Sequence, residues 1–245
     1  MPTVSGLVSR LLGRPRIQRP PCPIPTEDSF LTFATSVDKA APIPLRLLNL
    51  ALDAVKAIPT EVDLSDLAKR EDMPDWFTIW PGEHYALLAA LVLKLQPQIV
   101  IEIGTDKGMS SLALKKYLPP GGKLITYDIK PWKEVEDFVL RHSDFTDGRL
   151  EQRLVDLSDP LQIPSQRDLL ESADFFFIDA PKDNVFEYRL MQQFKLLKFK
   201  RNPILLFDDT RLTSMLPFWH ELPYPKLDIS SFGHWSGTGL VEWKP

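Results

Sequence analysis

The sequence predicts an α/β fold in which the strands of a mostly parallel sheet alternate with helices. Five short runs rich in apolar residues are typical of strands, at 99–103, 124–127, 150–155, 173–179 and 204–207. Between them, apolar residues recur at helical spacing, as in Phe186, Leu190, Phe194 and Leu197. Strands of this kind are buried by helices on both faces, which favours a Rossmann-like sheet.

The first strand begins a unit of strand, glycine loop and helix that carries the strongest signal. Ile99 to Ile103 are β-branched except for Glu102, which is typical of a central strand. Gly104 and Gly108 bracket a tight loop, and a helix follows until the prolines and glycines of 119–122 end it.

The second strand ends at Asp128, where a carboxylate can accept hydrogen bonds from both hydroxyls of a ribose bound over the loop. This predicts a ligand that contains a nucleoside. Asp106 stands where a dinucleotide fingerprint needs glycine, and the loop also lacks the spacing of a P-loop. Glu102 and Asp106 instead suit a cationic ligand, and S-adenosylmethionine carries a sulfonium and an ammonium.

Composition narrows the class of protein. With 245 residues, 44% of them hydrophobic, the chain can bury one sizeable core. The net charge of -4 argues against nucleic acid as a partner, and no apolar run is long enough for a transmembrane segment. The single cysteine, Cys22, cannot form an internal disulfide, which favours a reducing, cytoplasmic compartment.

Residues 1–27 are predicted to form an N-terminal arm with a proline-rich linker, followed by a single domain at 28–245. The arm has apolar residues at helical spacing between Val4 and Leu12, and four arginines without an acidic residue before Glu27. It is interpreted as an arm packed on its own domain or on a partner subunit of a homo-oligomer, with a transit peptide or a membrane-surface helix as alternatives. Within the domain, 28–95 forms a helical cap that covers the cofactor, and 96–245 forms the core.

Four further carboxylates follow the later strands. Asp156 follows the third strand, Asp179 ends the fourth, and Asp208 and Asp209 end the fifth. These side chains should meet along the edge of the sheet where ligands bind. Because Asp179, Asp208 and Asp209 lack obvious cationic partners in the sequence, they are predicted to hold a cation, and their oxygen ligands suit Mg²⁺.

The glycine loop resembles the first motif of class I S-adenosylmethionine-dependent methyltransferases, in the form Glu102-x-Gly104-x-x-x-Gly108. Asp179-Ala-Pro-Lys182 and Asp208-Asp209 resemble the metal-site motifs of the divalent-metal-dependent O-methyltransferases. These include the catechol, caffeoyl-CoA and macrolide-sugar enzymes, and the likeness covers about 82–210. The resemblance implies a seven-stranded sheet with an antiparallel last strand. The catechol type carries Asp-Asn after the fifth strand, so Asp208-Asp209 is closer to the sugar-methylating and cephalosporin-hydroxylase-like branch, which leaves the acceptor open.

Site roles follow from this resemblance. Asp179 and Lys182 are the predicted catalytic residues, with Lys182 as a proton acceptor, and Asp179, Asp208 and Asp209 are the predicted metal ligands. The predicted cofactor-binding residues are Glu102, Gly104, Thr105, Gly108, Ser110, Asp128, Asp156 and Asp179.

Several of these residues could instead have a purely structural role. Lys182 could be a surface lysine paired with Asp183 or Glu187. Asp209 could cap a helix that begins near Thr210, and Ser158 or Asp159 could cap the helix that follows them.

The expected function is transfer of a methyl group from S-adenosylmethionine to a hydroxyl of a small molecule, assisted by Mg²⁺. The alternatives are a metal-independent N- or O-methyltransferase and a non-catalytic cofactor-binding subunit. Two further expectations concern structure. A helix is predicted at 132–140, and the aromatic-rich loop at 231–237 either reaches the acceptor site or packs on the sheet edge.

Overall fold

The computed structural model describes residues 39–78 and 84–244. The predicted N-terminal helix, the proline-rich linker and the domain boundary after residue 27 lie outside these residues and stay predictions. None of the helices in the described part of the chain is long and apolar enough to cross a membrane.

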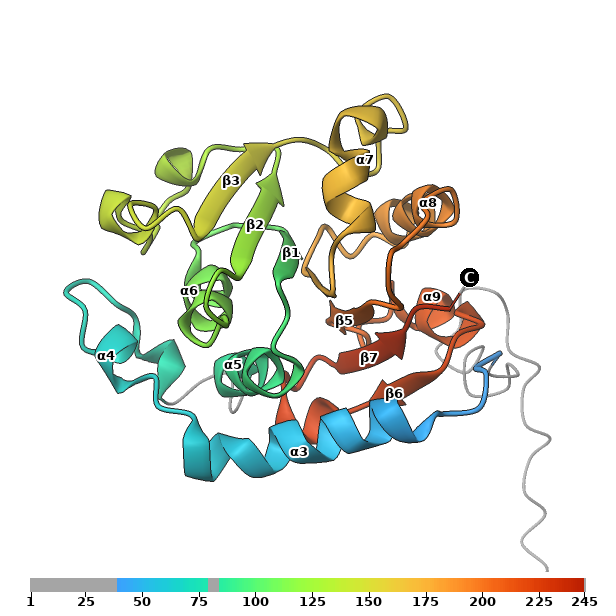
Figure 1. Ribbon diagram of the computed structural model, residues 1–245, viewed down its shortest axis with the longest axis horizontal. Helices are drawn as coiled ribbons and strands as arrows, with labels where there is room; N and C mark the ends of the chain where they lie inside the picture. Colours follow the sequence, from blue (N-terminus) through green and yellow to red (C-terminus); the bar gives the residue numbers. More distant parts are fainter. Residues whose placement is uncertain (1–38, 79–83, 245) are drawn as a thin grey trace, which may run out of the picture. The chain divides into compact units, whose positions relative to one another are not determined.

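Within the described residues, seven strands form one sheet in the order β3-β2-β1-β4-β5-β7-β6 (Figure 1). The first five strands pair in parallel, and β7 runs antiparallel to both β5 and β6. The predicted fold class is confirmed, including the antiparallel last strand. The strands span β1 Ile99–Ile103, β2 Lys123–Asp128, β3 Leu150–Leu154, β4 Phe175–Ile178, β5 Ile204–Asp208, β6 Lys226–Asp228 and β7 Thr238–Glu242.

Helices cover both faces of this sheet (Figure 1). Their bounds are α3 Leu45–Glu61, α4 Ser65–Ala68, α5 His84–Leu95, α6 Met109–Lys116, α7 Ile163–Glu171, α8 Val185–Phe194 and α9 Leu216–Glu221. Short 3-10 turns are η1 Asp75–Phe77, η2 Trp132–Glu134, η3 His142–Asp144 and η4 Ser230–Phe232.

Alternate side chains of the central strands enter two separate cores. Val100, Phe177 and Leu206 point toward α3, α5 and α6 and pack into one cluster of buried residues. Their neighbours Ile101 and Phe176 point the other way and pack with α7, α8 and α9. This alternation is why the strands read as continuous apolar runs in the sequence, because both faces are buried.

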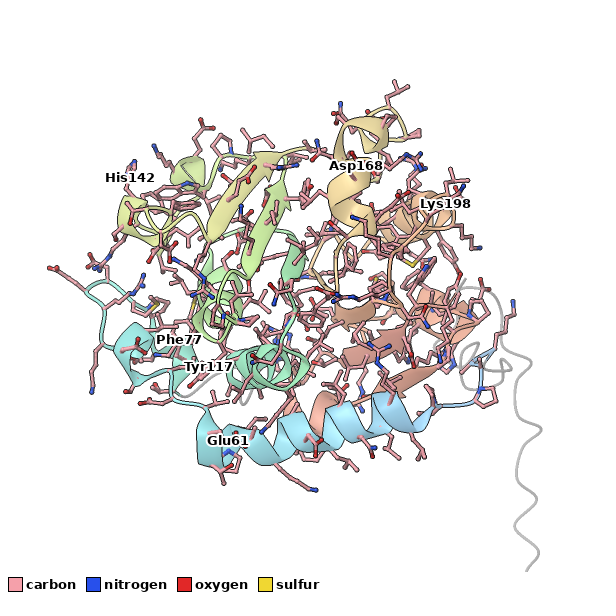
Figure 2. All side chains as sticks on the ribbon, in the orientation of Figure 1. Glu61, Phe77, Tyr117, His142, Asp168 and Lys198 are labelled. Carbon is pink, nitrogen blue, oxygen red and sulfur yellow. The ribbon has the colours of Figure 1, made fainter. Side chains whose placement is uncertain are left out.

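A contact between helices fixes part of the first layer. The phenol oxygen of Tyr117, just after α6, accepts a hydrogen bond of 2.7 Å from the backbone N–H of Asp63 and donates to the carbonyl of Glu61 at the end of α3 (Figure 2). This joins α3 to the C-terminal end of α6 on the same face of the sheet.

The helix predicted at 132–140 is wrong beyond the turn η2. Asp137 has a positive φ of 55°, which an α-helix does not contain. The backbone N–H of Val139 donates to the carbonyl of Lys107 at 2.9 Å, so the segment bonds to the glycine loop instead of to itself. The ring of Trp132 is stacked on Phe145, which holds this segment beside the loop.

The helix expected near Thr210 is also absent from the described chain there. α9 begins only at Leu216, and Asp209 has a positive φ of 60°. The alternative role of Asp209 as a helix cap is therefore wrong.

Candidate functional site

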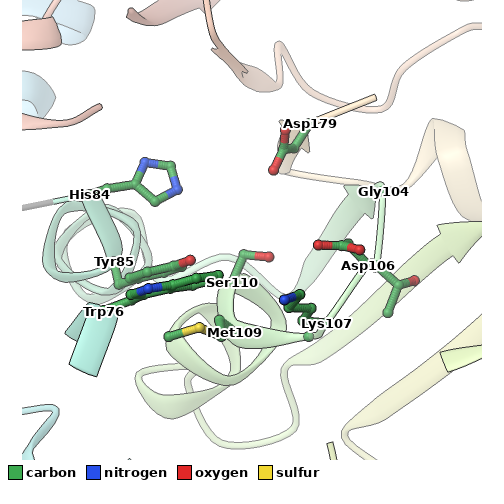
Figure 3. A pocket seen from close by; sticks show the side chains of 11 residues that line it. Trp76, His84, Tyr85, Gly104, Asp106, Lys107, Met109, Ser110 and Asp179 are labelled. Atoms are coloured by element: carbon green, nitrogen blue, oxygen red, sulfur yellow. The ribbon is translucent and has the colours of Figure 1, made fainter. Parts of the chain in front are cut away.

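Three neighbouring cavities lie at the carboxyl ends of β1, β2, β4 and β5. The glycine-loop cavity is bounded by residues 104–110 with Trp76, His84, Tyr85 and Asp179 (Figure 3). The β2–β3 cavity lies between Asp128 and Asp156 and reaches Pro181 and Phe186. The acidic cavity is lined by Trp76, His84, Tyr85, Asp179, Lys182, Asp208, Asp209 and His234. Asp179 lines all three, so it lies where they meet.

Two glycines give the loop its shape. Gly104 has a φ of +100°, and a Cβ there would lie 2.1 Å from the carbonyl oxygen of Asp179. Gly108 has a φ of +88° and precedes α6, and a Cβ there would lie 2.2 Å from the side chain of Leu140. Only glycine fits at either position, so the sequence motif is explained by backbone conformation and close packing.

Asp128 holds the loop in place through its carboxylate. One oxygen accepts the backbone N–H groups of Thr105 at 2.9 Å and Asp106 at 3.2 Å. The other accepts those of Ile129 at 2.7 Å and Lys130 at 3.0 Å. The residue predicted to bind a ribose therefore also organises the loop.

Glu102 is fully buried in β1, behind the loop. Its Oε2 accepts a short hydrogen bond from Ser111, whereas Oε1 has no hydrogen-bond partner. Burial raises the pKa of Glu102 to about 7, against the opposing effect of hydrogen bonds from Ser110 and Ser111. Glu102 lies outside the lining of the three cavities, and Ser110 stands between it and the glycine-loop cavity.

Asp156 and Asp159 each stabilise a turn and do not cap α7. Asp156 accepts the backbone N–H of Ser158 at 2.8 Å, and Asp159 accepts that of Leu161 at 2.9 Å. The helix begins only at Ile163 and lacks a side-chain cap, so the capping alternative is wrong. Asp156 lines the β2–β3 cavity, where it remains a candidate for contact with a base.

The acidic cluster has two cationic partners. Lys182 Nζ lies 2.5 Å from Asp179 Oδ1 and 2.8 Å from Asp209 Oδ2. His234 Nδ1 lies 3.2 Å from Asp209 Oδ1 and 3.4 Å from Asp208 Oδ2. The premise that these carboxylates lack cationic partners is wrong, because Lys182 pairs with Asp179 three residues away and also reaches Asp209, and His234 comes from a loop distant in sequence.

Lys182 is therefore part of the site and not a surface lysine. Glu187 accepts its backbone N–H at 3.1 Å, whereas its ammonium points at Asp179 and Asp209. The positive φ of Lys182, 59°, turns the loop so that this is possible.

Charge and burial shift the pKa values in opposite directions. Burial and the neighbouring Asp208 raise the pKa of Asp179 to about 7, although Lys182 opposes this. Hydrogen bonds from His234, Lys182 and Ser236 hold the pKa of Asp209 well below its usual range despite its burial. Although burial opposes it, the carboxylates raise the pKa of Lys182 above its usual value and that of His234 to about 9.

The cluster also contains atoms that could hold a metal ion. Asp208, Asp209 and His234 each offer one ligand atom, and these atoms lie within 4.8 Å of one another. Asp208 is buried, and its Oδ1 has no hydrogen-bond partner. An orphaned buried carboxylate oxygen is costly unless a ligand satisfies it, so these residues fit a divalent cation.

Two histidines of the site were missed as site residues in the sequence. His234 lies in the aromatic-rich loop at 231–237, and the structure decides that this loop reaches the acidic cavity. His84 begins α5 and is buried against Phe177 and His234, with ring centroids 5.9 and 5.3 Å away. The aromatic content of the loop was a sequence signal for His234, and the aromatic residues Trp76 and Phe77 ahead of α5 were one for His84 as a residue that lines the acceptor pocket.

Comparison with known proteins identifies the family of the chain. A model of the O-methyltransferase family matches residues 76–215, more than half of the chain. Catechol O-methyltransferase B of Danio rerio is 28% identical over 149 residues, which are 55% of this chain and 51% of that protein. The chain thus spans about half the length of this curated relative.

Solved structures are similar in fold. One, provisionally assigned as a caffeoyl-CoA O-methyltransferase from Staphylococcus aureus, is 15% identical with a TM-score of 0.51, and the match covers 80% of this chain and all of that one. An O-methyltransferase of tomaymycin synthesis from Streptomyces achromogenes, in complex with SAM, is 21% identical with a TM-score of 0.48 over 79% of this chain and 90% of that chain.

Proposed function

The chain belongs to the O-methyltransferase family, and we propose on this premise that it transfers the methyl group of S-adenosylmethionine to a hydroxyl group of a small molecule. The observation that carries the proposal is the position of Asp179. Asp179 lines the glycine-loop cavity, the β2–β3 cavity and the acidic cavity. A cofactor on one side and an acceptor on the other would meet at this residue.

The glycine-loop side suits the cofactor. The β2–β3 cavity, about 280 Å³ in volume, has the carboxylates of Asp128 and Asp156 for polar contacts and Leu157 and Phe186 as apolar walls, which suits adenosine. The glycine-loop cavity would take the methionine portion, with Thr105, Gly108 and Ser110 around it. The carboxylates of Asp106 and Asp179 there favour an ammonium and a sulfonium over a phosphate (Figure 3).

The acidic cavity suits the acceptor. Methyl transfer is an in-line displacement, so the cavity must hold a hydroxyl oxygen about 3 Å from the methyl carbon and favour loss of its proton. The ammonium of Lys182 is held between two carboxylates that raise its pKa, so it positions groups and retains its proton. Asp179 borders both the glycine-loop cavity and the acidic cavity, so its carboxylate is the group placed to accept the proton of the acceptor.

A divalent cation would be held by Asp208 and Asp209, with Asp179 beside them, and Mg²⁺ is the cation expected from the sequence. When bound, it would supply a Lewis acid that lowers the pKa of the acceptor hydroxyl. It would also neutralise the carboxylates in addition to Lys182. The orphaned Oδ1 of Asp208 supports this part of the proposal.

The class of acceptor, the cellular location and the oligomeric state are proposed in general terms. We expect a small hydroxylated molecule flanked by the rings of Trp76 and Tyr85, which border the acidic cavity. A cytoplasmic location and a homo-oligomer remain predictions from the sequence, testable by fractionation and by light scattering.

The test measures cofactor binding and methyl transfer separately. Calorimetry with S-adenosylmethionine should show binding, and a labelled methyl group should appear in a panel of phenolic, catecholic and sugar hydroxyl acceptors. Asp179→Asn should abolish transfer, and a chelator should suppress it until a divalent cation is restored. Full activity in chelator would favour the metal-independent alternative. Binding without transfer to any acceptor would favour the non-catalytic subunit.

A further inference from the structure

His234 points a single nitrogen at three oxygen atoms of the acidic cavity. Its Nδ1 lies 2.7 Å from Ser236 Oγ, 3.2 Å from Asp209 Oδ1 and 3.4 Å from Asp208 Oδ2. Ring N–H groups bond best near 2.9 Å, and one hydrogen can be directed well at only one of these acceptors. One ring hydrogen is thus shared among three oxygen atoms, and the two carboxylate oxygens lie farther from Nδ1 than in the best hydrogen bonds.

The same distances suit ligands that share one metal ion. For metal–ligand bonds of about 2.1 Å, neighbouring ligand atoms lie about 3.0 Å apart in an octahedron and about 3.4 Å apart in a tetrahedron. The separations of 3.2 and 3.4 Å between Nδ1 and the two carboxylate oxygens fall in this range. Ligand atoms of all three residues lie within 4.8 Å of one another.

A second observation outside this cluster also indicates a missing ligand. His84 comes from α5 and also lines the cavity, beside the ring of His234, and only 4% of its surface is exposed. Its Nδ1 is buried without a hydrogen-bond partner. Figure 3 shows its ring directed toward Asp179. A buried imidazole nitrogen without a partner, facing a cavity, is expected where a ligand completes the site.

The loop that carries His234 is held rigidly in this position. The backbone N–H of His234 donates to Thr238 Oγ1 at 2.8 Å, and the backbone N–H of Arg211 donates to the carbonyl of Ser236 at 2.8 Å. Gly237 has a φ of +118°, and a Cβ there would lie 2.4 Å from the backbone nitrogen of Arg211. Ser236 also donates a short hydrogen bond to Asp209 Oδ1, which orients that carboxylate, as groups around metal ligands commonly do.

We propose that His234 is a metal ligand together with Asp208 and Asp209, and that this mixed nitrogen and oxygen set prefers a divalent transition metal, such as Mn²⁺ or Zn²⁺, over Mg²⁺. Imidazole binds such metals far better than it binds Mg²⁺, which keeps oxygen ligands and water. The inference deepens the metal-assisted part of the proposed function and rests on it. It differs from the sequence expectation in one ligand and in the preferred cation.

The test uses Mn²⁺ alone, without cofactor or acceptor, on protein stripped with a chelator. Pulsed electron paramagnetic resonance should detect ¹⁴N coupling from a directly bound imidazole. His234→Ala should remove this coupling and weaken Mn²⁺ binding roughly 100-fold by calorimetry, since it deletes a ligand outright. His142→Gln, at an exposed histidine elsewhere, is the matched control and should leave both readouts unchanged.

A second variant tests the preference itself. His234→Asp replaces nitrogen by oxygen and should shift the preference toward Mg²⁺, measured as the Mg²⁺ concentration that displaces Mn²⁺. Failure to bind Mn²⁺, Mn²⁺ bound without ¹⁴N coupling, or equal displacement by Mg²⁺ in both proteins would overturn the inference. Circular dichroism checks that each variant folds. None of these readouts needs methyl transfer, so a protein that binds metal as described but neither S-adenosylmethionine nor acceptor would refute only the proposed function.

Discussion

The backbone of Gly104 passes so close to Asp179 that a Cβ on Gly104 would lie 2.1 Å from the Asp179 carbonyl oxygen. The ends of β1 and β4 therefore touch through their main chains at the centre of the site. The atoms that would clash with a side chain at Gly104 belong to the protein backbone. A substitution there should therefore destabilise the fold itself and not only weaken cofactor binding. The following variants test this and three related features.

Gly104→Ala should lower the free energy of unfolding by about 3 kcal/mol or more, because it combines a strained φ with a backbone clash. Gly148→Ala is the matched control. Its φ is also positive, +68°, but nothing lies within 4 Å of its Cβ position. Urea unfolding of both variants separates the effect of backbone strain from that of the clash. Similar losses of unfolding free energy in the two variants would contradict the close approach of Gly104 to Asp179.

Asp128→Ala should destabilise the protein even without cofactor, by about 2–3 kcal/mol, because four backbone N–H groups lose a charged acceptor. Asp156→Ala removes a single such bond in the same cavity and should cost less. Denaturant unfolding of the cofactor-free proteins is the measurement. An unchanged stability for Asp128→Ala would mean that the carboxylate serves only a ligand.

Glu102 should make the protein less stable as the pH rises. Burial raises its pKa from 4.5 to about 7, so between these values the folded state binds a proton that the unfolded state releases. The stability contribution of Glu102 is thus present below about pH 4.5 and is lost as the pH rises through 7. Glu102→Gln should flatten the fall in unfolding free energy between pH 5 and 8, whereas the exposed control Glu151→Gln should not. An unaltered slope would show that Glu102 titrates normally.

Lys182→Met should lower the free energy of unfolding by about 1–3 kcal/mol, because Asp179 and Asp209 lose the ammonium that neutralises them. A divalent cation should restore most of this loss if it occupies the cluster. Lys94→Met breaks an exposed pair with Glu61 and serves as the control. Thermal unfolding with and without Mg²⁺ or Mn²⁺ decides the matter, and a loss that no cation reverses would argue against a metal here.

Much of the fold could be predicted because its signals are local. The apolar runs of β1, β4 and β5 are continuous because each strand is covered on both faces, and each run ends in a loop with glycine or aspartate. The rule that parallel strands end at a common edge then brings Asp128, Asp179 and Asp208 together. The helix predicted at 132–140 failed because its backbone bonds to Lys107, a contact outside the segment.

The charge balance of the site could not be predicted because it depends on pairs distant in sequence. Lys182 reaches Asp209 across two strands, and His234 reaches it from a loop that follows β6. The sequence shows three carboxylates but not which loops turn back toward them. Lys182 and Asp209 have positive φ angles, which orient their side chains toward the site. Glycine at such positions would have indicated these turns in the sequence, but neither residue is a glycine.

The position of β7 constrains the order in which the molecule can be assembled as it is synthesised. β7 lies between β5 and β6, although it follows both in the chain. β6 therefore has no partner in the sheet until the ribosome has released Glu242, and the His234 loop between β6 and β7 has no anchor before then. The glycine loop and the carboxylates after β4 and β5 come earlier in the chain, so the part of the acidic cavity that must wait is the one formed by His234. A nascent chain should thus acquire its affinity for a nucleoside before it completes the pocket where chemistry would take place.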